Sequence, residues 1–248
     1  MAPRPDSVDI LGVAVAPLDL QGTVAFLERT LDLGERVFVV TANPEFVMLC
    51  RRDRAVREAS PSAHRLVVPD GVGLVLAARL LGVAIPGRAR GRELAPRLAE
   101  VARDRGLSLY LLGAREGVAA RAADGLTKRV PGVRVAGTYA GSAEDDDDSV
   151  PRVAAARPDI LLVAYGMPKQ ELWITRNLGR LPSVRIAVGV GGAFDYLAGE
   201  TPLPPEWLAR IGLEWLWRLV RQPWRWRRQL ALPVFLLLVL RERFARAA

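Results

Sequence analysis

Six short apolar runs, separated by stretches long enough to form helices, constrain the fold more than any other feature of the sequence. The runs are rich in Val, Ile and Leu, and they lie at residues 36–41, 64–69, 107–113, 133–137, 159–165 and 185–191. The stretches between them, such as 93–106 and 117–130, carry apolar residues at helical spacing. Strands that are apolar throughout and alternate with helices are typical of a parallel sheet buried on both faces. The sequence therefore predicts an α/β fold in which helices cover both faces of a parallel sheet.

Composition narrows the kinds of site that the chain can build. With 248 residues, of which 50% are hydrophobic, it can bury a substantial core. Cys50 is the one cysteine and His64 the one histidine, which excludes a disulfide framework, a zinc site of Cys and His ligands, and catalysis by several histidines. No signal peptide is recognisable, and the longest apolar run, Leu230–Leu240, has 11 residues where a bilayer span needs roughly 20. We expect a cytoplasmic protein.

Positive charge and tryptophan are concentrated near the end of the sequence. The net charge is +8, and residues 205–248 contain nine Arg and three Glu, so this segment alone contributes +6. It also holds five of the six Trp residues. We therefore predict two parts: an α/β domain at residues 1–200, called the body below, and a basic, Trp-rich appendage at residues 201–248, called the tail.

Polar residues and glycines follow five of the predicted strands, and in parallel sheets ligands bind outside these carboxyl ends. The segments are TANPEF at 41–46, Asp70 with its following glycines, Gly113 with the turn after it, GMPKQE at 166–171 and GGAFDY at 191–196. Singly, each also reads as an ordinary turn or helix cap. Together, along one rim, they favour a site for a polyhydroxylated ligand that carries phosphate. The helix expected after Gly113 would offer free N–H groups to an anion.

Several segments, in the same order, resemble the WecG/TagA/CpsF glycosyltransferases, also called glycosyltransferase family 26. The resemblance runs from about Val8 to Leu230 and is carried by TANPEF, VVPDGVGLV, YLLGAREGVA, PDILLVAYGMPKQELWI, VGVGGAFDYLAGE and RIGLEWLWRLVRQPWRWRRQL. It implies a Rossmann-like catalytic domain with a C-terminal membrane-docking appendage. The implied reaction is inverting transfer of an N-acetylhexosamine-type sugar, N-acetylmannosamine or a related one, from a UDP-sugar to an undecaprenyl-diphosphate-linked acceptor. Such transfer belongs to bacterial surface polysaccharide or teichoic acid synthesis.

The resemblance also implies roles for individual positions. Asp70 matches the family's proposed general base, and Thr41 and Asn43 match a polar pair at the sugar end of the ligand. Arg88 matches an arginine thought to meet the diphosphate, and Gln170 matches the glutamine of PKQE.

Two segments depart from the family pattern. RGRE at 90–93 stands where many relatives have Thr-Gly-x-Asp. TYAGSA at 138–143 stands where relatives often have Gly-Tyr-Phe. Because of these departures, the resemblance does not identify the preferred sugar. The departures have less effect on the expected type of reaction.

Inverting sugar transfer requires a base for the acceptor hydroxyl and positive or dipolar groups for the departing UDP. Asp70 at a strand tip suits the first role, because Gly71 and Gly73 let other atoms approach closely. An arginine such as Arg88 can hold a diphosphate through two parallel hydrogen bonds, which a lysine cannot. No Asp-x-Asp motif follows a predicted strand, so we expect a metal-independent enzyme without a cofactor.

The segment GMPKQE fits the same site. Gly166 permits a tight turn, and Pro168 begins the next helix without needing a partner for an N–H group. Gln170 then projects toward the ligand. We expect its neighbours Lys169 and Glu171 to make surface or structural contacts instead.

Other kinds of site fit the sequence less well. A dinucleotide-binding fingerprint is unsupported, because GVGGAF at 189–194 lacks the third glycine and has no acidic residue about 20 positions further on. The acidic run at 141–150 could bind a cation, but a solvated surface loop explains it more simply. A non-catalytic, membrane-attached UDP-sugar-binding or scaffold protein is the alternative to an enzyme, and the presence of Asp70 favours the enzyme.

Trp and Arg are interleaved along the tail, which is typical of segments that bind a membrane surface. Trp prefers the headgroup level, and Arg meets anionic lipid or a lipid diphosphate. The residues predicted for this role are Arg218, Arg221, Arg225 and Arg228.

Three other roles stay open for the tail. Trp215 and Trp217 could pack in the core, and the tail could form a homo-oligomer interface or a lid over the site. Aromatic and basic residues also mix in proteins that bind single-stranded nucleic acids. No RNA-binding motif is present and the body has a ligand rim, so we predict no nucleic acid partner. The protein is expected to lie peripherally on the inner face of the plasma membrane.

Overall fold

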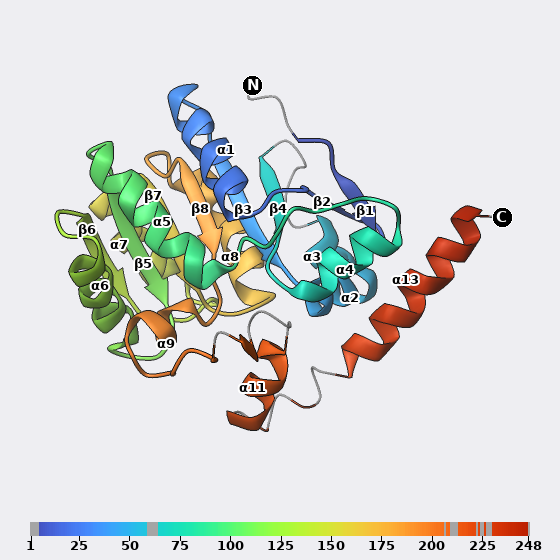
Figure 1. Cartoon of the computed structure of the whole chain (residues 1–248). Coiled ribbons are helices and arrows are strands. Elements are labelled where there is room, and N and C mark those ends of the chain that lie inside the picture. Colours follow the sequence, from blue (N-terminus) through green and yellow to red (C-terminus); the bar gives the residue numbers. More distant parts are fainter. Residues whose placement is uncertain are drawn as a thin grey trace.

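A computed structural model describes residues 5–58, 64–205, 207–208, 213–221, 223, 226 and 230–247. Its centre is a six-stranded sheet with the strand order β4-β3-β8-β7-β5-β6, in which every neighbouring pair is parallel. The strands are β3 (Val37–Ala42), β4 (Arg65–Pro69), β5 (Ser108–Gly113), β6 (Arg134–Tyr139), β7 (Ile160–Ala164) and β8 (Ile186–Gly189). Each overlaps one of the six apolar runs, so the predicted parallel α/β fold is confirmed (Figure 1).

Two hydrophobic cores lie on the two faces of this sheet. Successive side chains of a strand point to opposite faces. Val39 of β3 therefore joins one core, and Val40 joins the other. The first face is covered by α1 (Leu20–Asp32), α5 (Gly91–Asp104), α6 (Val118–Arg129) and α9 (Ala193–Leu197). The second is covered by α2 (Pro44–Arg52), α3 (Arg54–Glu58), α4 (Val72–Leu80), α7 (Asp146–Ala156) and α8 (Lys169–Asn177), which a short 3-10 helix (Leu178–Arg180) follows.

A small antiparallel hairpin precedes the sheet and was not anticipated from the sequence. Its strands are β1 (Val8–Ile10) and β2 (Val13–Val15). Leu11 and Gly12 join them with φ values of 54° and 87°, the left-handed pair that tight hairpins favour. Ile10 and Val15 are fully buried, so the hairpin extends the second core.

The prediction of a solvated loop over the acidic run is wrong in its second half. Asp146 begins α7, and the side chain of Asp145 caps that helix by accepting from the N–H of Asp148. Acidic side chains at a helix N-terminus are stabilised by the helix dipole. Arg176 of α8 also pairs with Asp146, so the run fastens two helices together.

Two helices of the tail are described, α11 (Glu214–Arg221) and α13 (Ala231–Ala247). α13 packs on α2 and α4, where Phe235 is 4% exposed and Val239 is fully buried. Its other side exposes apolar residues, Leu237 among them at 66%. Figure 1 shows both helices, in red, at the outside of the body. Within the described ranges, no helix has the length and apolar character needed to cross a bilayer. The division into two domains stays a prediction.

Candidate active site

A pocket of about 490 Å³ opens at the carboxyl ends of β3, β4, β7 and β8. It brings together six residues that the sequence predicted for the site: Thr41, Asn43, Asp70, Arg88, Gly166 and Gln170. Their individual roles stay predictions. Gly113 lies apart from the residues that line this pocket. With φ at 100°, a Cβ there would lie 2.9 Å from the backbone carbon of Ala164, so packing explains this glycine.

Asp70 is held at the tip of β4 by its backbone and by two glycines. Its N–H donates to the carbonyl of Ala42 over 2.7 Å. A Cβ on Gly73 would lie 2.5 Å from Cγ of Pro44, and one on Gly71 would lie 3.2 Å from the same ring. The glycines therefore allow the start of α4 to pack against the start of α2, as expected. This packing fixes the backbone that presents the Asp70 carboxylate to the pocket.

Thr41 and Asn43 are each oriented by a structural hydrogen bond. The hydroxyl of Thr41 donates to the carbonyl of Gly189 over 2.8 Å, which joins the ends of β3 and β8. Oδ1 of Asn43 accepts from the N–H of Phe46 over 2.9 Å and so caps α2. The cap that the sequence allowed is therefore present, and the amide N–H₂ of Asn43 is its remaining donor toward the pocket.

Gln170 is buried and held at both atoms of its amide. Its Oε1 accepts from the N–H of Gly191 over 3.0 Å, and its Nε2 donates to Glu171 over 2.8 Å. A Cβ on Gly189 would lie 2.6 Å from Nε2, so this glycine makes room for the amide. Gly166, with φ at 77°, forms the turn before α8. One N–H of the Gln170 amide is left for a ligand.

The two neighbours of Gln170 have different surroundings. Lys169 pairs with Glu144 on the surface at 2.8 Å, as expected. Glu171 is 3% exposed and lines the pocket, so it does not make a surface contact. Its hydrogen bond with Gln170 is the structural contact that was expected. Burial raises the pKa of Glu171 to about 7, against the opposing effect of that hydrogen bond. Its second oxygen is buried without a hydrogen-bond partner among the described residues.

Replacing Glu171 by Gln is expected to remove a pH dependence of stability. The pKa of Glu171 rises from 4.5 to about 7 on folding, so the folded protein retains a proton that the unfolded chain releases. The free energy of unfolding should therefore fall between pH 4.5 and 7, by on the order of 2 to 3 kcal/mol from this one group. Urea unfolding of both proteins at about pH 5 and pH 8 measures the difference. An identical pH dependence in the variant would contradict the buried, protonated carboxyl.

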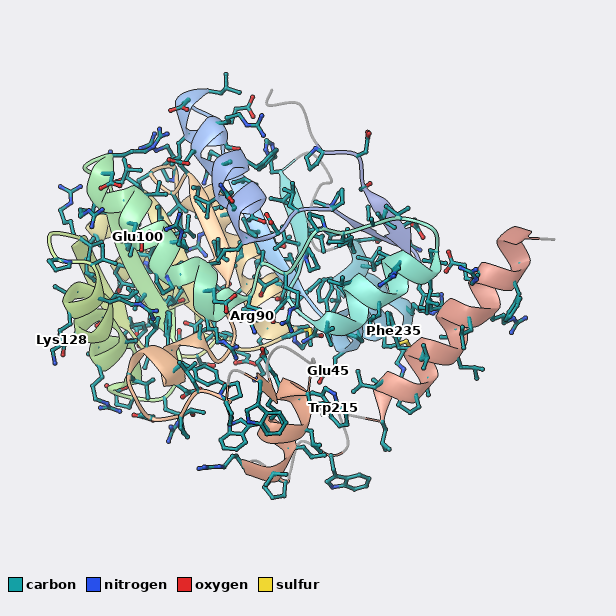
Figure 2. The ribbon with its side chains drawn as sticks, viewed as in Figure 1. Glu45, Arg90, Glu100, Lys128, Trp215 and Phe235 are labelled. Carbon is teal, nitrogen blue, oxygen red and sulfur yellow. The ribbon has the colours of Figure 1, made fainter. Side chains whose placement is uncertain are left out.

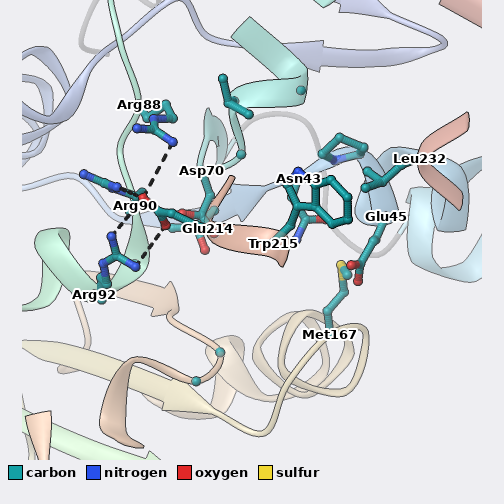
Figure 3. A pocket seen from close by; sticks show the side chains of 18 of the residues that line it. Asn43, Glu45, Asp70, Arg88, Arg90, Arg92, Met167, Glu214, Trp215 and Leu232 are labelled. Carbon is teal, nitrogen blue, oxygen red and sulfur yellow. Dashed lines mark hydrogen bonds and ion pairs between the residues drawn. The ribbon is translucent and has the colours of Figure 1, made fainter. Parts of the chain in front are cut away.

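Three arginines surround one carboxylate at another wall of the pocket (Figure 3). Arg88, Arg90 and Arg92 all pair with Glu214 of α11. Arg88 lies 3.8 Å from Oε1, whereas Arg92 contacts both oxygens, at 2.9 and 3.0 Å. The second interaction of Arg90 is with Glu93, from Nε over 2.8 Å. Burial and the charge of Arg90 lower the pKa of Arg88, and the nearby carboxylates of Glu214, Glu93 and Asp70 oppose this effect. Burial opposes the charged form of Arg90 as well, but its hydrogen bond with Glu93 and the same carboxylates raise its pKa.

Sequence reasoning assigned only Arg88 of this cluster. The other two arginines were seen as departures from a family pattern, and Glu214 was not assigned. The spacing of Arg88 and Arg90, in the non-helical segment before α5, is a partial signal, because residues two apart in an extended segment lie on one side. Arg92 lies in the first turn of α5, so this rule does not place it with them. Nothing in the local sequence indicates that Glu214, far along the chain, meets these arginines.

The remaining wall is apolar and comes from α4 and the tail. Its residues are Leu76, Ala77, Leu80, Trp215, Leu232, Phe235, Leu236 and Val239. Figure 2 shows Arg90, Trp215 and Phe235 in the same region, with Lys128 at the opposite end of the body. The pocket thus has a charged side and an apolar side.

Comparison with known proteins decides the family. The sequence profile described as "Glycosyl transferase WecG/TagA/CpsF family" matches residues 8–248. The chain belongs to the WecG/TagA/CpsF glycosyltransferase family. It is therefore an enzyme that transfers a sugar, as the resemblance implied.

Similar proteins of this family have been named in several bacteria. The chain is 34% identical to an N-acetylglucosaminyldiphosphoundecaprenol N-acetyl-beta-D-mannosaminyltransferase of Bacillus spizizenii over 230 residues, which cover 92% of this chain and 89% of that one. Proteins with the same name from Bacillus subtilis strain 168 and Staphylococcus aureus strain MRSA252 are 31% and 30% identical. Those matches cover 90% and 92% of this chain, and 87% and 90% of the relatives.

The other residues considered for this glycosyltransferase lie elsewhere or cannot be placed. Asp195 of the GGAFDY segment, which follows β8, lies outside the pocket lining, 3.7 Å from Arg115. Arg221 is exposed and stacks over the ring of Trp217, with 4.7 Å to the ring centroid. Arg225 and Arg228 lie outside the described residues, as does the side chain of Arg218. The predicted role of these tail arginines therefore stays a prediction.

Proposed function

We propose that this glycosyltransferase transfers an N-acetylmannosamine-type sugar from a UDP-sugar to an undecaprenyl-diphosphate-linked acceptor, with inversion. The observation that carries the proposal is the two-sided pocket, with Asp70 and arginines on one side and apolar residues of α4 and α13 on the other. Its charged side suits a diphosphate, and its apolar side suits the lipid of an amphipathic acceptor. The names of the relatives, which act on a diphosphoundecaprenol-linked sugar, support the same acceptor class.

In the proposed reaction Asp70 is the base. Its carboxylate takes the proton of the acceptor hydroxyl as that oxygen attacks the anomeric carbon of the donor. The new glycosidic bond forms on the face opposite the UDP, the bond to UDP breaks, and UDP leaves with the electron pair. Arg88 stabilises the negative charge that grows on the departing diphosphate. We propose that the arginines serve where other enzymes use a metal ion.

Transfer of label from radiolabelled UDP-N-acetylmannosamine to a short-chain lipid-diphosphate acceptor tests this function. Parallel assays with other UDP-sugars identify the preferred donor. Product formation with one of these donors is expected. Binding of UDP-sugars without any transfer would instead favour the non-catalytic scaffold.

Replacing Arg88 by Lys is expected to weaken UDP binding about tenfold or more. The charge remains, but one hydrogen bond to a charged group is lost, and such a bond contributes about 1.5 to 3 kcal/mol. Calorimetric titration with UDP measures the change. Arg121→Lys is the matched control, because Arg121 pairs with Glu200 away from the pocket. Equal affinity in the Arg88 variant would place the diphosphate elsewhere. Titration with and without EDTA tests the proposed independence of metal.

The proposed place of action is the inner face of the plasma membrane. The tail exposes large apolar side chains beside its basic residues, including Trp207, Val220, Trp226, Leu237 and Phe244. Such side chains enter the headgroup region, while arginine is attracted to anionic lipid. Contact of this surface with the membrane would bring the apolar side of the pocket toward the lipid-linked acceptor.

A further inference from the structure

Glu214 lies in a position that a ligand anion could occupy. It comes from the first turn of α11, whereas its three arginine partners lie in the body, in the segment after α4 and the first turn of α5. The side chain of Glu214 is 17% exposed, and those of Arg88, Arg90 and Arg92 are 19%, 18% and 14% exposed. These are not pairs on an open surface, which contribute little to stability. All four residues line the pocket that also holds Asp70.

The geometry around Glu214 is that of an oxyanion site. Arg92 contacts both carboxylate oxygens, the forked arrangement that arginine also makes with phosphate. Arg90 is oriented by Glu93, and Arg92 lies over the ring of Tyr196, with 5.5 Å to its centroid. Two of the three guanidinium groups are thus held in place by groups other than Glu214. They would remain arranged for an anion if Glu214 withdrew.

We propose that Arg88, Arg90 and Arg92 form a diphosphate subsite that Glu214 occupies in the free enzyme, and that a ligand diphosphate displaces Glu214 and with it α11. The identity of the ligand as a diphosphate rests on the proposed function. A diphosphate carries more negative charge than one carboxylate and more oxygen atoms to share among three guanidinium groups. It can therefore replace Glu214 at the same arginines.

The displacement would also change the wall of the pocket. Trp215, the residue after Glu214, lines the pocket and is 38% exposed. α13 is held separately, by the buried side chains of Phe235 and Val239. Release of Glu214 would therefore move α11 and Trp215 while α13 stays on the body. The α11 part of the tail then acts as a lid over the site, which is one of the roles that the sequence left undecided.

Calorimetric titration of the full-length protein with inorganic pyrophosphate tests the proposal. Glu214→Gln keeps the size of the side chain but removes its charge, so pyrophosphate should bind about tenfold more tightly, as expected when a competing charge-assisted pair is lost. Glu200→Gln is the matched control, since Glu200 also pairs with two arginines but lies outside the pocket. Its affinity for pyrophosphate should equal that of the unaltered protein. Unchanged or weaker binding by E214Q would overturn the proposal and make Glu214 a support for the arginines.

Arg92→Gln is a second variant with the opposite expectation. It should weaken pyrophosphate binding about tenfold, since it removes the forked contact. Unchanged binding would overturn the subsite. The far-ultraviolet circular dichroism spectra of both variants, compared with that of the unaltered protein, test whether the variants fold.

Two further ligands distinguish the sources of the diphosphate. If E214Q binds UDP more tightly than the unaltered protein does, the arginines form a subsite for the donor. If it binds farnesyl diphosphate more tightly, they form a subsite for the acceptor. Unchanged affinity for both ligands overturns the proposal. These titrations need no turnover, so an enzyme that binds pyrophosphate as expected but transfers no sugar would contradict the proposed function and leave the subsite intact.

Tryptophan fluorescence reports the movement of α11. Five of the six Trp residues lie in the tail, and Trp173 in the body is fully buried. Pyrophosphate should change the emission of the unaltered protein, and E214Q without ligand should already show the changed emission. Identical emission of the free proteins, with no response to pyrophosphate, would overturn the displacement.

Discussion

Asp70→Asn is expected to lower turnover about 10²-fold or more, the usual contribution of acid–base catalysis, while UDP affinity stays near that of the unaltered enzyme. Asparagine has the size of aspartate but cannot accept the proton of the acceptor hydroxyl. The backbone position should persist, because the Ala42 carbonyl and the packing of Gly71 and Gly73 on Pro44 do not involve the carboxylate. Initial rates with radiolabelled donor give the turnover, and calorimetry gives the affinity for UDP.

Asp195→Asn is the matched control for this experiment. Asp195 also follows a strand at the rim, but it faces Arg115 outside the pocket. Its replacement should leave turnover within a small factor of normal. Near-normal turnover of the Asp70 variant would show that another group takes the proton.

Replacing Arg221, Arg225, Arg227 and Arg228 by Glu is expected to abolish binding to anionic vesicles. A basic residue near an anionic surface contributes about 1 kcal/mol, so loss of four attractions weakens the partition by roughly 10³-fold even before the new repulsion is counted. Sedimentation with vesicles that contain phosphatidylglycerol measures binding. Salt should weaken the binding of the unaltered protein, because ions screen charges at a surface.

The matched control reverses four exposed basic residues of the body: Arg29, Lys128, Arg129 and Arg134. This control variant has the same net charge as the tail variant, and it should still sediment with the vesicles. Normal vesicle binding by the tail variant would refute the membrane role. Deletion of residues 205–248 is a weaker test, because it also removes the buried side chains of Phe235 and Val239 from the core.

Most of the sheet was predictable because five of its strands, all but β6 at the edge, are buried on both faces. Such strands are apolar throughout, and the crossover helices between them have their own spacing of apolar residues. The β1–β2 hairpin has strands of three residues, too short for a periodic pattern. The acidic run was misread as loop because its aspartates, poor helix formers in the interior, are favourable in the first turn of α7.

Much of the site was predictable from strand order. Asp70 follows β4 and Gln170 lies in the first turn of the helix after β7, and parallel strands bring their carboxyl ends to one rim. Arg88 was predicted from the family resemblance alone. Glu214 could not be placed in this way, since its contact with Arg92 depends on how the tail packs on the body. The same limit applies to the apolar wall, which joins α4 to α13 across most of the sequence.

The pocket takes its walls from residues that are synthesised early and late, from Thr41 to Val239. A ribosome releases the N-terminal part first, and domains begin to fold in that order. The polar rim built on β3 and β4 can therefore assemble while α13 is still being made. Ala77 of α4 lies in the same buried core as Phe235 and Val239, so α4 lacks the cover of α13 until that helix is made. A chain interrupted before α13 would have the arginines, Asp70 and the α4 part of the apolar wall, but not the part of that wall that α13 supplies.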